Sequence, residues 1–229
     1  METDRFTRRN SLARLGGLVV AGLGGRALVS SEAEGGNKAV ESGAVSCVLT
    51  PELTEGPYYI AGEKVRRDIR EGHRGTLLTL RLQVLNAATC APIKNAAVDI
   101  WHADAAGNYS GFGAGASSRT FLRGIQRTDA SGLAVFTTIY PGWYQGRTVH
   151  IHVKVHLGGN IVHTGQLYFP DTLTDAVFRK QPYSARPNRD VRNAADSIFR
   201  NGGSKSLLSV KKNSAGVHVA TIMMGVHRS

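Results

Sequence analysis

Two histidines separated by one residue, His150-Ile151-His152, form the sharpest local pattern that could support chemistry. On a β-strand, residues i and i+2 point to the same face, about 6.6 Å apart. Two imidazoles at that spacing can lean together and bind one metal ion through nitrogens at about 2.1 Å. The alternative is a chance pair on a solvated strand face. His156 continues this face, but about 13 Å of strand separates it from His152, too far for the same ion.

Two tyrosines precede the histidine pair, each in a turn flanked by glycines. Tyr109 lies in the turn 104–111, and Tyr144 lies in the turn 140–147. Each turn follows a predicted strand, so that a rigid sheet could aim the phenol. One tyrosine alone is more often a surface or packing aromatic. In the order Tyr, Tyr, His-x-His, the four side chains form a combined pattern, which we take as the candidate site.

Alternation of apolar and polar residues predicts the strands that must position these side chains. The alternation is most regular over 149–157, which places His150 and His152 on one face and apolar residues on the other. Further strands are predicted at 77–85, 97–101, 133–139, 161–169 and 217–226, and short helices at 171–178 and 190–199. Many strands with turns between them predict an all-β fold, a β-sandwich with short helices and long active-site loops. This domain is expected to span residues 47–229.

The candidate residues belong to a longer set of motifs. These are Thr54-Glu55-Gly56-Pro57-Tyr58-Tyr59, Asp99-Ile100-Trp101-His102-Ala103-Asp104, Asn108-Tyr109-Ser110, Pro141-Gly142-Trp143-Tyr144, Arg147-Thr148-Val149-His150-Ile151-His152 and Gly165-Gln166-Leu167-Tyr168-Phe169. As a set, they resemble the intradiol ring-cleavage dioxygenases, the family of protocatechuate 3,4-dioxygenase and catechol 1,2-dioxygenase. The resemblance covers nearly all of 47–226. It implies a non-heme Fe(III) enzyme that uses O2 to cleave catechol-type aromatics between the two hydroxylated carbons, giving cis,cis-muconate-type products.

The resemblance also implies a role for each matching residue. Tyr144 and His150 would be axial iron ligands, and Tyr109 and His152 equatorial ones. Tyr144 would leave the metal when substrate binds, and Arg147 would stabilise negative charge on the ring. Arg147 and Gln166 would line the substrate pocket, with Pro57 and Tyr58 on one wall. Two tyrosinates and one hydroxide balance the three charges of a ferric ion, and hard anionic oxygens favour Fe(III).

The sequence departs from the family pattern at its N-terminal side. The long helical dimerisation region of the catechol 1,2-dioxygenase branch is missing, so that a homo-oligomer is left open. The chain looks closer to exported single-chain members than to the two-subunit protocatechuate enzymes. Catechol, hydroxyquinol, protocatechuate and lignin-derived catechols all remain candidate substrates.

The first residues predict export. Arg8-Arg9, a mild apolar stretch at 15–25 and small residues up to 33 resemble a twin-arginine signal, and 34–46 reads as a linker. We therefore expect a bacterial protein of the periplasm or the extracellular medium. An ordinary flexible basic N-terminus is the alternative. No run of eighteen apolar residues is present, which excludes a membrane-spanning helix.

The net charge bears on the kind of partner that the protein binds, and the cysteines bear on a possible disulfide. The formal net charge is +11, but the basic residues are scattered and no basic motif is interleaved with aromatics, which argues against nucleic acid as a partner. Cys47 and Cys90 are the two cysteines, and they could form a disulfide in an oxidising compartment. Two free buried thiols are the alternative.

Two other functions compete with the dioxygenase hypothesis. A β-sandwich module could bind copper or zinc through His150, His152 and His156 without catalysis, and it would need neither Tyr109 nor Tyr144. A basic adhesion or wall-binding domain would bind no metal tightly. Tyrosinate-to-iron charge transfer would colour the dioxygenase red-brown, whereas a zinc or copper(I) protein would be colourless.

Overall fold

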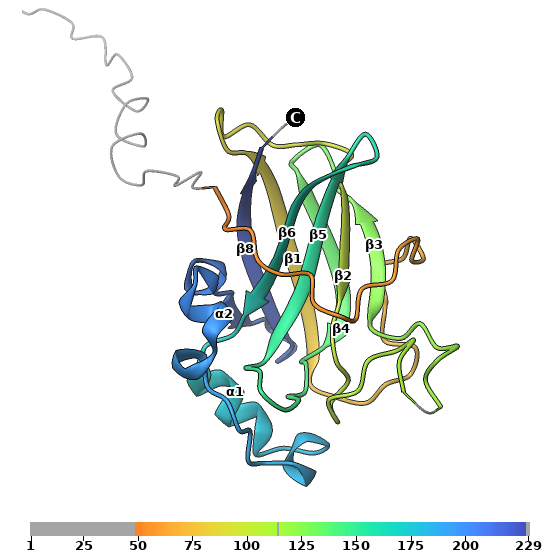
Figure 1. Cartoon of the computed structure of the whole chain (residues 1–229), viewed down its shortest axis with the longest axis vertical. Coiled ribbons are helices and arrows are strands. Elements are labelled where there is room, and N and C mark those ends of the chain that lie inside the picture. The colour runs from red at the N-terminus through yellow and green to blue at the C-terminus, as the bar shows by residue number, and fades with distance from the viewer. Residues whose placement is uncertain (1–48, 114, 228–229) are drawn as a thin grey trace, which may run out of the picture. The chain divides into compact units, whose positions relative to one another are not determined.

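Two four-stranded sheets make up the computed structural model, which describes residues 49–113 and 115–227 (Figure 1). The first sheet has the order β4-β1-β8-β7, formed by β4 (Leu133–Ile139), β1 (Leu77–Asn86), β8 (His218–Val226) and β7 (Ser209–Lys212). The second has the order β3-β2-β5-β6, formed by β3 (Arg123–Arg127), β2 (Ala97–Trp101), β5 (His150–Leu157) and β6 (Asn160–Tyr168). Neighbouring strands are antiparallel except for the parallel pair β1 and β8.

The core lies between the two sheets, and strand alternation explains it. Leu80 and Leu82 of β1 are fully buried, while Arg81 between them is exposed. They share one hydrophobic cluster with Ile151 and Val153 of β5. Because successive side chains of a strand point to opposite faces, the same alternation sends His150 and His152 to the other face of β5. The predicted all-β sandwich is confirmed.

The six predicted strands are present, each within one residue of its expected bounds. Sequence alternation did not reveal the other two described strands, β3 and β7. Both lie at sheet edges and have mostly polar sequences, RGIQR and SVKK. Edge strands commonly carry charged residues, which protect them from pairing with other chains. That composition removes the apolar periodicity on which a prediction depends.

One predicted helix is present and the other is wrong as a continuous helix. The helix α1 (Asp171–Phe178) has its expected bounds. The segment 190–199 instead contains the 3-10 turn η2 (Asn193–Ala195) and the short helix α2 (Ser197–Arg200). Asp196 separates them because its backbone is extended and its carboxylate caps α2, accepting hydrogen bonds from the N–H groups of Ile198 and Phe199. Two further 3-10 turns are η1 (Tyr183–Ala185) and η3 (Gly203–Ser206).

The irregular segment 49–66, which we call the N-terminal strap, crosses the polar face of the second sheet (Figure 1, orange). Its contacts run from β6 to β3: the Leu53 N–H donates to the Thr164 carbonyl, Glu55 forms an ion pair with Lys154, and the Arg66 N–H donates to the Ile125 carbonyl. Under this cover, the polar face of β5 is as buried as its apolar face. The alternative of a histidine pair on a solvated face is therefore wrong.

The predicted export signal 1–33 and linker 34–46 lie outside the described residues and stay predictions. Within the part of the chain that the structure describes, no helix combines the length and the apolar character that crossing a bilayer requires.

Cys90 follows β1 and takes part in a disulfide. Its predicted partner, Cys47, lies outside the described residues, so this pairing stays a prediction. Closing a loop of about 40 residues stabilises a fold by about 4 kcal/mol through the unfolded state. We expect reductant to lower the melting temperature by about 10 °C. Calorimetry with and without reductant tests this, and a Cys47→Ser/Cys90→Ser double variant should melt at the reduced temperature under both conditions. Unchanged melting of the wild type would contradict the pairing.

Candidate metal centre

The two histidines of β5 direct their Nε2 atoms to one point. Their Nε2 atoms lie 3.1 Å apart, and both rings are buried. The Nδ1 of His150 lies 2.6 Å from the Thr148 carbonyl. Because a carbonyl can only accept, this nitrogen carries the proton and the Nε2 of His150 keeps its lone pair. The Nδ1 of His152 is buried and has no hydrogen-bond partner among the described residues.

Neighbouring elements hold the ring of His152 on two sides. Trp101 of β2 is directly paired with His152, and the two rings are stacked with centroids 4.9 Å apart and planes inclined by 6°. On another side, Gly56 of the strap approaches so closely that a Cβ atom would lie 3.1 Å from the ring. Gly56 also has a φ of +72°, which other residues rarely adopt. A larger residue at position 56 would therefore displace either the strap or the imidazole.

Both candidate tyrosines lie beside the histidine pair. The Tyr144 hydroxyl lies 3.2 Å from the Nε2 of His150. The Tyr109 ring lies 5.6 Å from the Tyr144 ring and 6.1 Å from the His152 ring, centroid to centroid. The Tyr109 hydroxyl is buried beside Tyr144, and within the described parts of the chain no hydrogen bond of normal geometry satisfies it. The structure thus brings together all four side chains of the sequence pattern.

Close packing between the two tyrosine-bearing turns explains their glycines. A Cβ atom on Gly107 would lie 2.3 Å from the Trp143 carbonyl oxygen, and one on Gly142 would lie 2.3 Å from that of Asp104. The Gly142 N–H donates to the same Asp104 oxygen at 3.0 Å. The Asp104 carboxylate accepts hydrogen bonds from the backbone N–H groups of Ala106 and Asn108. The turns therefore lock together and hold both phenols in place.

Burial sets the protonation states at the centre. It lowers the pKa of His150 to about 3 and the pKa of His152 well below its usual value. Both imidazoles are therefore neutral near pH 7, which is the state that binds a metal. Burial also raises the pKa of Tyr144, and it raises the pKa of Tyr109 well above 10, with the nearby Tyr144 adding to the shift. Without a cation, both phenols keep their protons.

These features fit a metal ion with oxygen and nitrogen ligands. Buried polar atoms without partners are costly, and the Tyr109 hydroxyl is such an atom, on a ring that lies beside those of Tyr144 and His152. No group of three or more His, Cys, Asp or Glu side chains in the described residues could hold a metal ion. This contradicts the alternative site built from His150, His152 and His156. A metal at this position would require the two tyrosines.

Arg147 lies beside the four candidate ligands and is held by two partners. Its Nε donates to the Asp196 carboxylate at 2.8 Å, and its Nη2 donates to the Gln166 side-chain oxygen at 2.5 Å. Burial alone would lower the pKa of Arg147, but the hydrogen bond to Asp196 raises it above its usual value. The guanidinium is thus a permanent positive charge, and it opposes the rise in the pKa of Tyr144.

The other predicted pocket residues lie on β6 and on the strap. The Gln166 oxygen also accepts a hydrogen bond from the Tyr168 hydroxyl at 2.9 Å, and its amide donates to the Thr54 carbonyl at 2.9 Å. Tyr58 stacks on Tyr109 with centroids 4.3 Å apart and planes inclined by 13°. Pro57 is exposed next to it. The strap therefore places Tyr58 against a candidate ligand.

Sequence reasoning missed Asp196 and Tyr168 as site residues. Asp196 is 49 positions from Arg147 in a segment predicted to be helical, and no local signal connects the two. His102 is also near the site, but both of its ring nitrogens have partners, the Ala103 carbonyl at 2.9 Å and the Thr138 hydroxyl at 2.8 Å. Burial lowers its pKa to about 4. With both ring nitrogens occupied in this way, His102 is a structural histidine.

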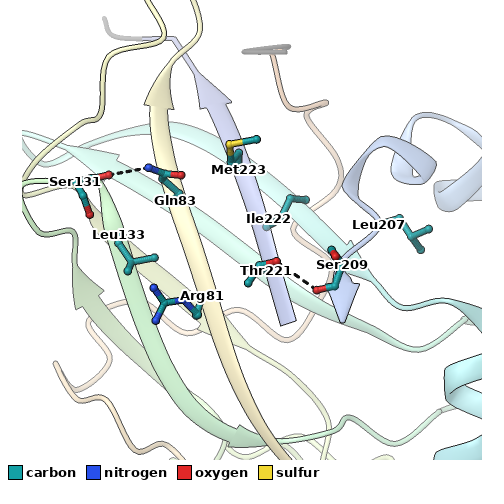
Figure 2. Close-up of a pocket in the computed structure, with 9 residues that line it drawn as sticks. All are labelled: Arg81, Gln83, Ser131, Leu133, Leu207, Ser209, Thr221, Ile222 and Met223. Carbon is teal, nitrogen blue, oxygen red and sulfur yellow. Dashed lines mark hydrogen bonds between the residues drawn. The ribbon is translucent and has the colours of Figure 1, made fainter. Parts of the chain in front are cut away.

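A groove on the other sheet is separate from this centre. Figure 2 shows it on the solvent face of β4, β1, β8 and β7, where the labelled side chains enclose about 520 Å³. Its lining includes the apolar side chains of Leu207, Ile222 and Met223, together with Arg81 and Gln83. It contains neither histidine nor tyrosine, so that it offers no comparable metal ligands.

Comparison with known proteins agrees with this geometry. A family model described as "Dioxygenase" matches residues 54–189, more than half of the chain. An intradiol ring-cleavage dioxygenase from Tetranychus urticae is 35% identical and superposes with a TM-score of 0.76, covering 79% of this chain and 95% of that chain. The chain belongs to the intradiol ring-cleavage dioxygenase family. All four candidate ligands, Arg147 and Gln166 fall inside the region that the family model matches.

Two other similar proteins show how far the similarity extends. The dioxygenase domain of a dioxygenase carbohydrate-binding protein fusion from Streptomyces sp. SirexAA-E is 30% identical, with a TM-score of 0.62 over 80% of this chain and all of that chain. Catechol 1,2-dioxygenase 2 of Acinetobacter lwoffii is 35% identical over 149 residues, which cover 58% of this chain and 49% of that protein. The chain therefore spans about half the length of this curated relative.

Proposed function

We propose that this protein is a non-heme Fe(III) dioxygenase. It would cleave catechol-type aromatics between the two hydroxylated carbons, with O2 as the second substrate and cis,cis-muconate-type dicarboxylic acids as products. The observation that carries the proposal is the convergence of one buried phenol, one half-buried phenol and two buried, neutral imidazoles beside a half-buried arginine. Similarity to proteins named catechol 1,2-dioxygenase supports the substrate class.

Tyr109, Tyr144, His150 and His152 would hold the iron. Two phenolates supply hard, negatively charged oxygens, which favour the ferric state, and the imidazoles add neutral nitrogens. When bound, Fe(III) would polarise a chelated catechol so that the ring itself reacts with O2. Since burial keeps both phenols protonated, binding of iron should release protons and should weaken as the pH falls.

The protein's own groups would then act on the substrate. A catechol must lose its two hydroxyl protons to bind as a dianion. The Tyr144 phenolate oxygen would accept one of them, and the hydroxide that balances the ferric charge would accept the other. Arg147 would stabilise the negative charge that develops on the ring. The strap would exclude water from the face of β5 that carries the histidines.

The same proposal includes a place of action outside the cytoplasm. The composition of residues 1–33 supports export by the twin-arginine route, which moves folded proteins and would allow iron to bind beforehand. The mature enzyme would then act in the periplasm or in the medium on a diffusing catechol.

Colour and oxygen consumption test the proposal together. The purified protein loaded with Fe(III) should be red-brown, and it should consume O2 with catechol, hydroxyquinol or protocatechuate. Resorcinol, whose hydroxyls are not adjacent, is the matched control and should give no uptake because it cannot chelate through both oxygens. The product of catechol should be the ring-opened dicarboxylic acid. A colourless protein that consumes no O2 with any ortho-diphenol would overturn the proposal and favour the adhesion or wall-binding alternative.

A further inference from the structure

Arg123, on the edge strand β3, is a buried cation without a role in the proposed chemistry. Its side chain is only 1% exposed, although arginine is among the residues that are seldom fully buried unless paired. The nearest carboxylate oxygen, on Glu63 of the strap, lies 3.9 Å away, which is too far for a hydrogen bond. A structural ion pair is therefore an insufficient explanation for its burial.

The guanidinium instead binds the backbone of two separate segments. Its Nη1 donates to the Tyr58 carbonyl at 2.6 Å, and its Nη2 donates to the Ser110 carbonyl at 2.7 Å. Its Nε donates to the Ser110 hydroxyl at 2.9 Å. Tyr58 belongs to the strap, and Ser110 directly follows the candidate ligand Tyr109. One rigid, planar group thus connects the strap to the turn that carries Tyr109.

The two segments meet again through their aromatic rings. The rings of Tyr58 and Tyr109 are stacked at 4.3 Å, and the Cζ of Arg123 lies 5.9 Å from the centre of the Tyr109 ring. Tyr58 also contacts Tyr144 edge to face at 6.0 Å. The position of the Arg123 guanidinium therefore affects how the Tyr58 ring of the strap stacks on the Tyr109 ring. A lysine would keep the positive charge, but it could not reproduce three donors in one plane.

We propose that Arg123 is a positioning residue that sets the Tyr109 phenol relative to His152 and Tyr144. The inference rests on the proposed function, because Tyr109 matters as a ligand only if the centre binds iron. Groups that orient metal ligands typically change metal affinity on the order of 10- to 100-fold when they are replaced. We expect an effect of that size at Arg123 even though it touches no reacting atom.

The experiment compares Arg123→Lys with Arg127→Met, a change at the exposed end of the same strand. Each protein is loaded with Fe(III), and a competing chelator measures its iron affinity. The wavelength of the tyrosinate-to-iron absorption band is recorded with it, since this band reports on the phenolate–iron bond. We expect Arg123→Lys to shift the band and to weaken iron binding on the order of 10- to 100-fold. Arg127→Met should match the wild type in both.

A merely structural role for Arg123 would give a different result. Arg123→Lys would then melt at a lower temperature, while its folded form kept the wild-type band and affinity, and this outcome would overturn the inference. If Arg123→Lys fails to fold, Ser110→Ala replaces it, because this variant keeps the guanidinium and removes the hydroxyl that accepts from the Nε and donates to the Phe121 carbonyl. Ser110→Ala should shift the band in the same direction, and an unshifted band would again overturn the inference.

Failure of the inference and failure of the proposed function are distinguishable in these data. If the wild type is red-brown and consumes O2 while the variants match it, only the role of Arg123 is wrong. If the wild type binds no Fe(III) and shows no band, the proposed function is wrong, and the role of Arg123 with it.

Discussion

Tyr109→Phe is expected to abolish iron binding and colour while leaving the metal-free protein at least as stable as the wild type. The reason is that the Tyr109 hydroxyl is buried beside Tyr144 and, within 49–113 and 115–227, makes no hydrogen bond of normal geometry. Removing an unpaired buried hydroxyl removes its desolvation cost, so the free energy of unfolding of the metal-free protein should not fall. Removing a ligand should lower the iron affinity more than about 100-fold, which exceeds the usual effect of replacing a group that only orients a ligand.

Tyr140→Phe is the matched control for this change. Tyr140 is equally buried, but its hydroxyl forms a hydrogen bond with the Thr174 hydroxyl at 2.7 Å, away from the centre. This variant should lose about 1 kcal/mol of stability and keep its iron and colour. Denaturant titration of the metal-free proteins and iron analysis of the loaded ones measure both effects. A Tyr109→Phe protein that retains iron and its absorption band would remove Tyr109 from the ligand set.

His152→Ala should lose iron and colour in the same way, but it should also destabilise the metal-free protein. The imidazole fills the space between the Trp101 indole and the strap, so that alanine leaves a cavity there. The two ligand variants therefore share one functional defect and differ in the sign of their effect on stability.

Arg147→Ala is expected to keep iron and colour but to lose turnover. The guanidinium contacts no candidate ligand by a hydrogen bond, yet its charge acts on the site where negative charge develops. Loss of one such stabilising group typically costs about 100- to 1,000-fold in kcat. Arg189→Ala is the control, since it removes an arginine that pairs with Asp171 and Asp175 instead of with Asp196 and Gln166.

The stability of Arg147→Ala needs to be separated from its catalysis. The variant leaves the buried carboxylate of Asp196 without its cation, which can cost about 3–5 kcal/mol. In the double variant Arg147→Ala/Asp196→Asn the unpaired charge is gone, so stability should largely return while turnover stays low. Steady-state kinetics and denaturant titration of both variants check this. Full turnover in a folded Arg147→Ala protein would exclude this residue from the mechanism.

Local periodicity explains what could be predicted from this sequence. The strict alternation of β5 predicts that His150 and His152 share a face, and the structure places their Nε2 atoms together. Glycines at 107 and 142 indicate tight turns, and these turns bring Tyr109 and Tyr144 to the same place. Each of these inferences needs only a few neighbouring residues and the geometry of one strand or turn.

Contacts between distant irregular segments could not be predicted. Asp196, whose extended backbone interrupts the predicted helix, pairs with Arg147 through its carboxylate across 49 positions, and Arg123 meets Tyr58 across 65 positions. The strap has no apolar period because it lies on a sheet as an irregular chain, fixed by backbone hydrogen bonds and single side chains. Nothing in its composition indicates which strand each residue will cover.

The course of the strap also has a consequence for the order in which the molecule folds. Glu52 accepts a hydrogen bond from the Thr164 N–H, a contact between positions 112 residues apart. Contacts between residues so far apart in the sequence have a large entropic cost of loop closure, and they form slowly. The second sheet should therefore assemble before the strap docks on it. During that interval both imidazoles of β5 face solvent, and an ion can reach them without any channel through the finished protein. The metal can therefore already be taken up before the last folding step.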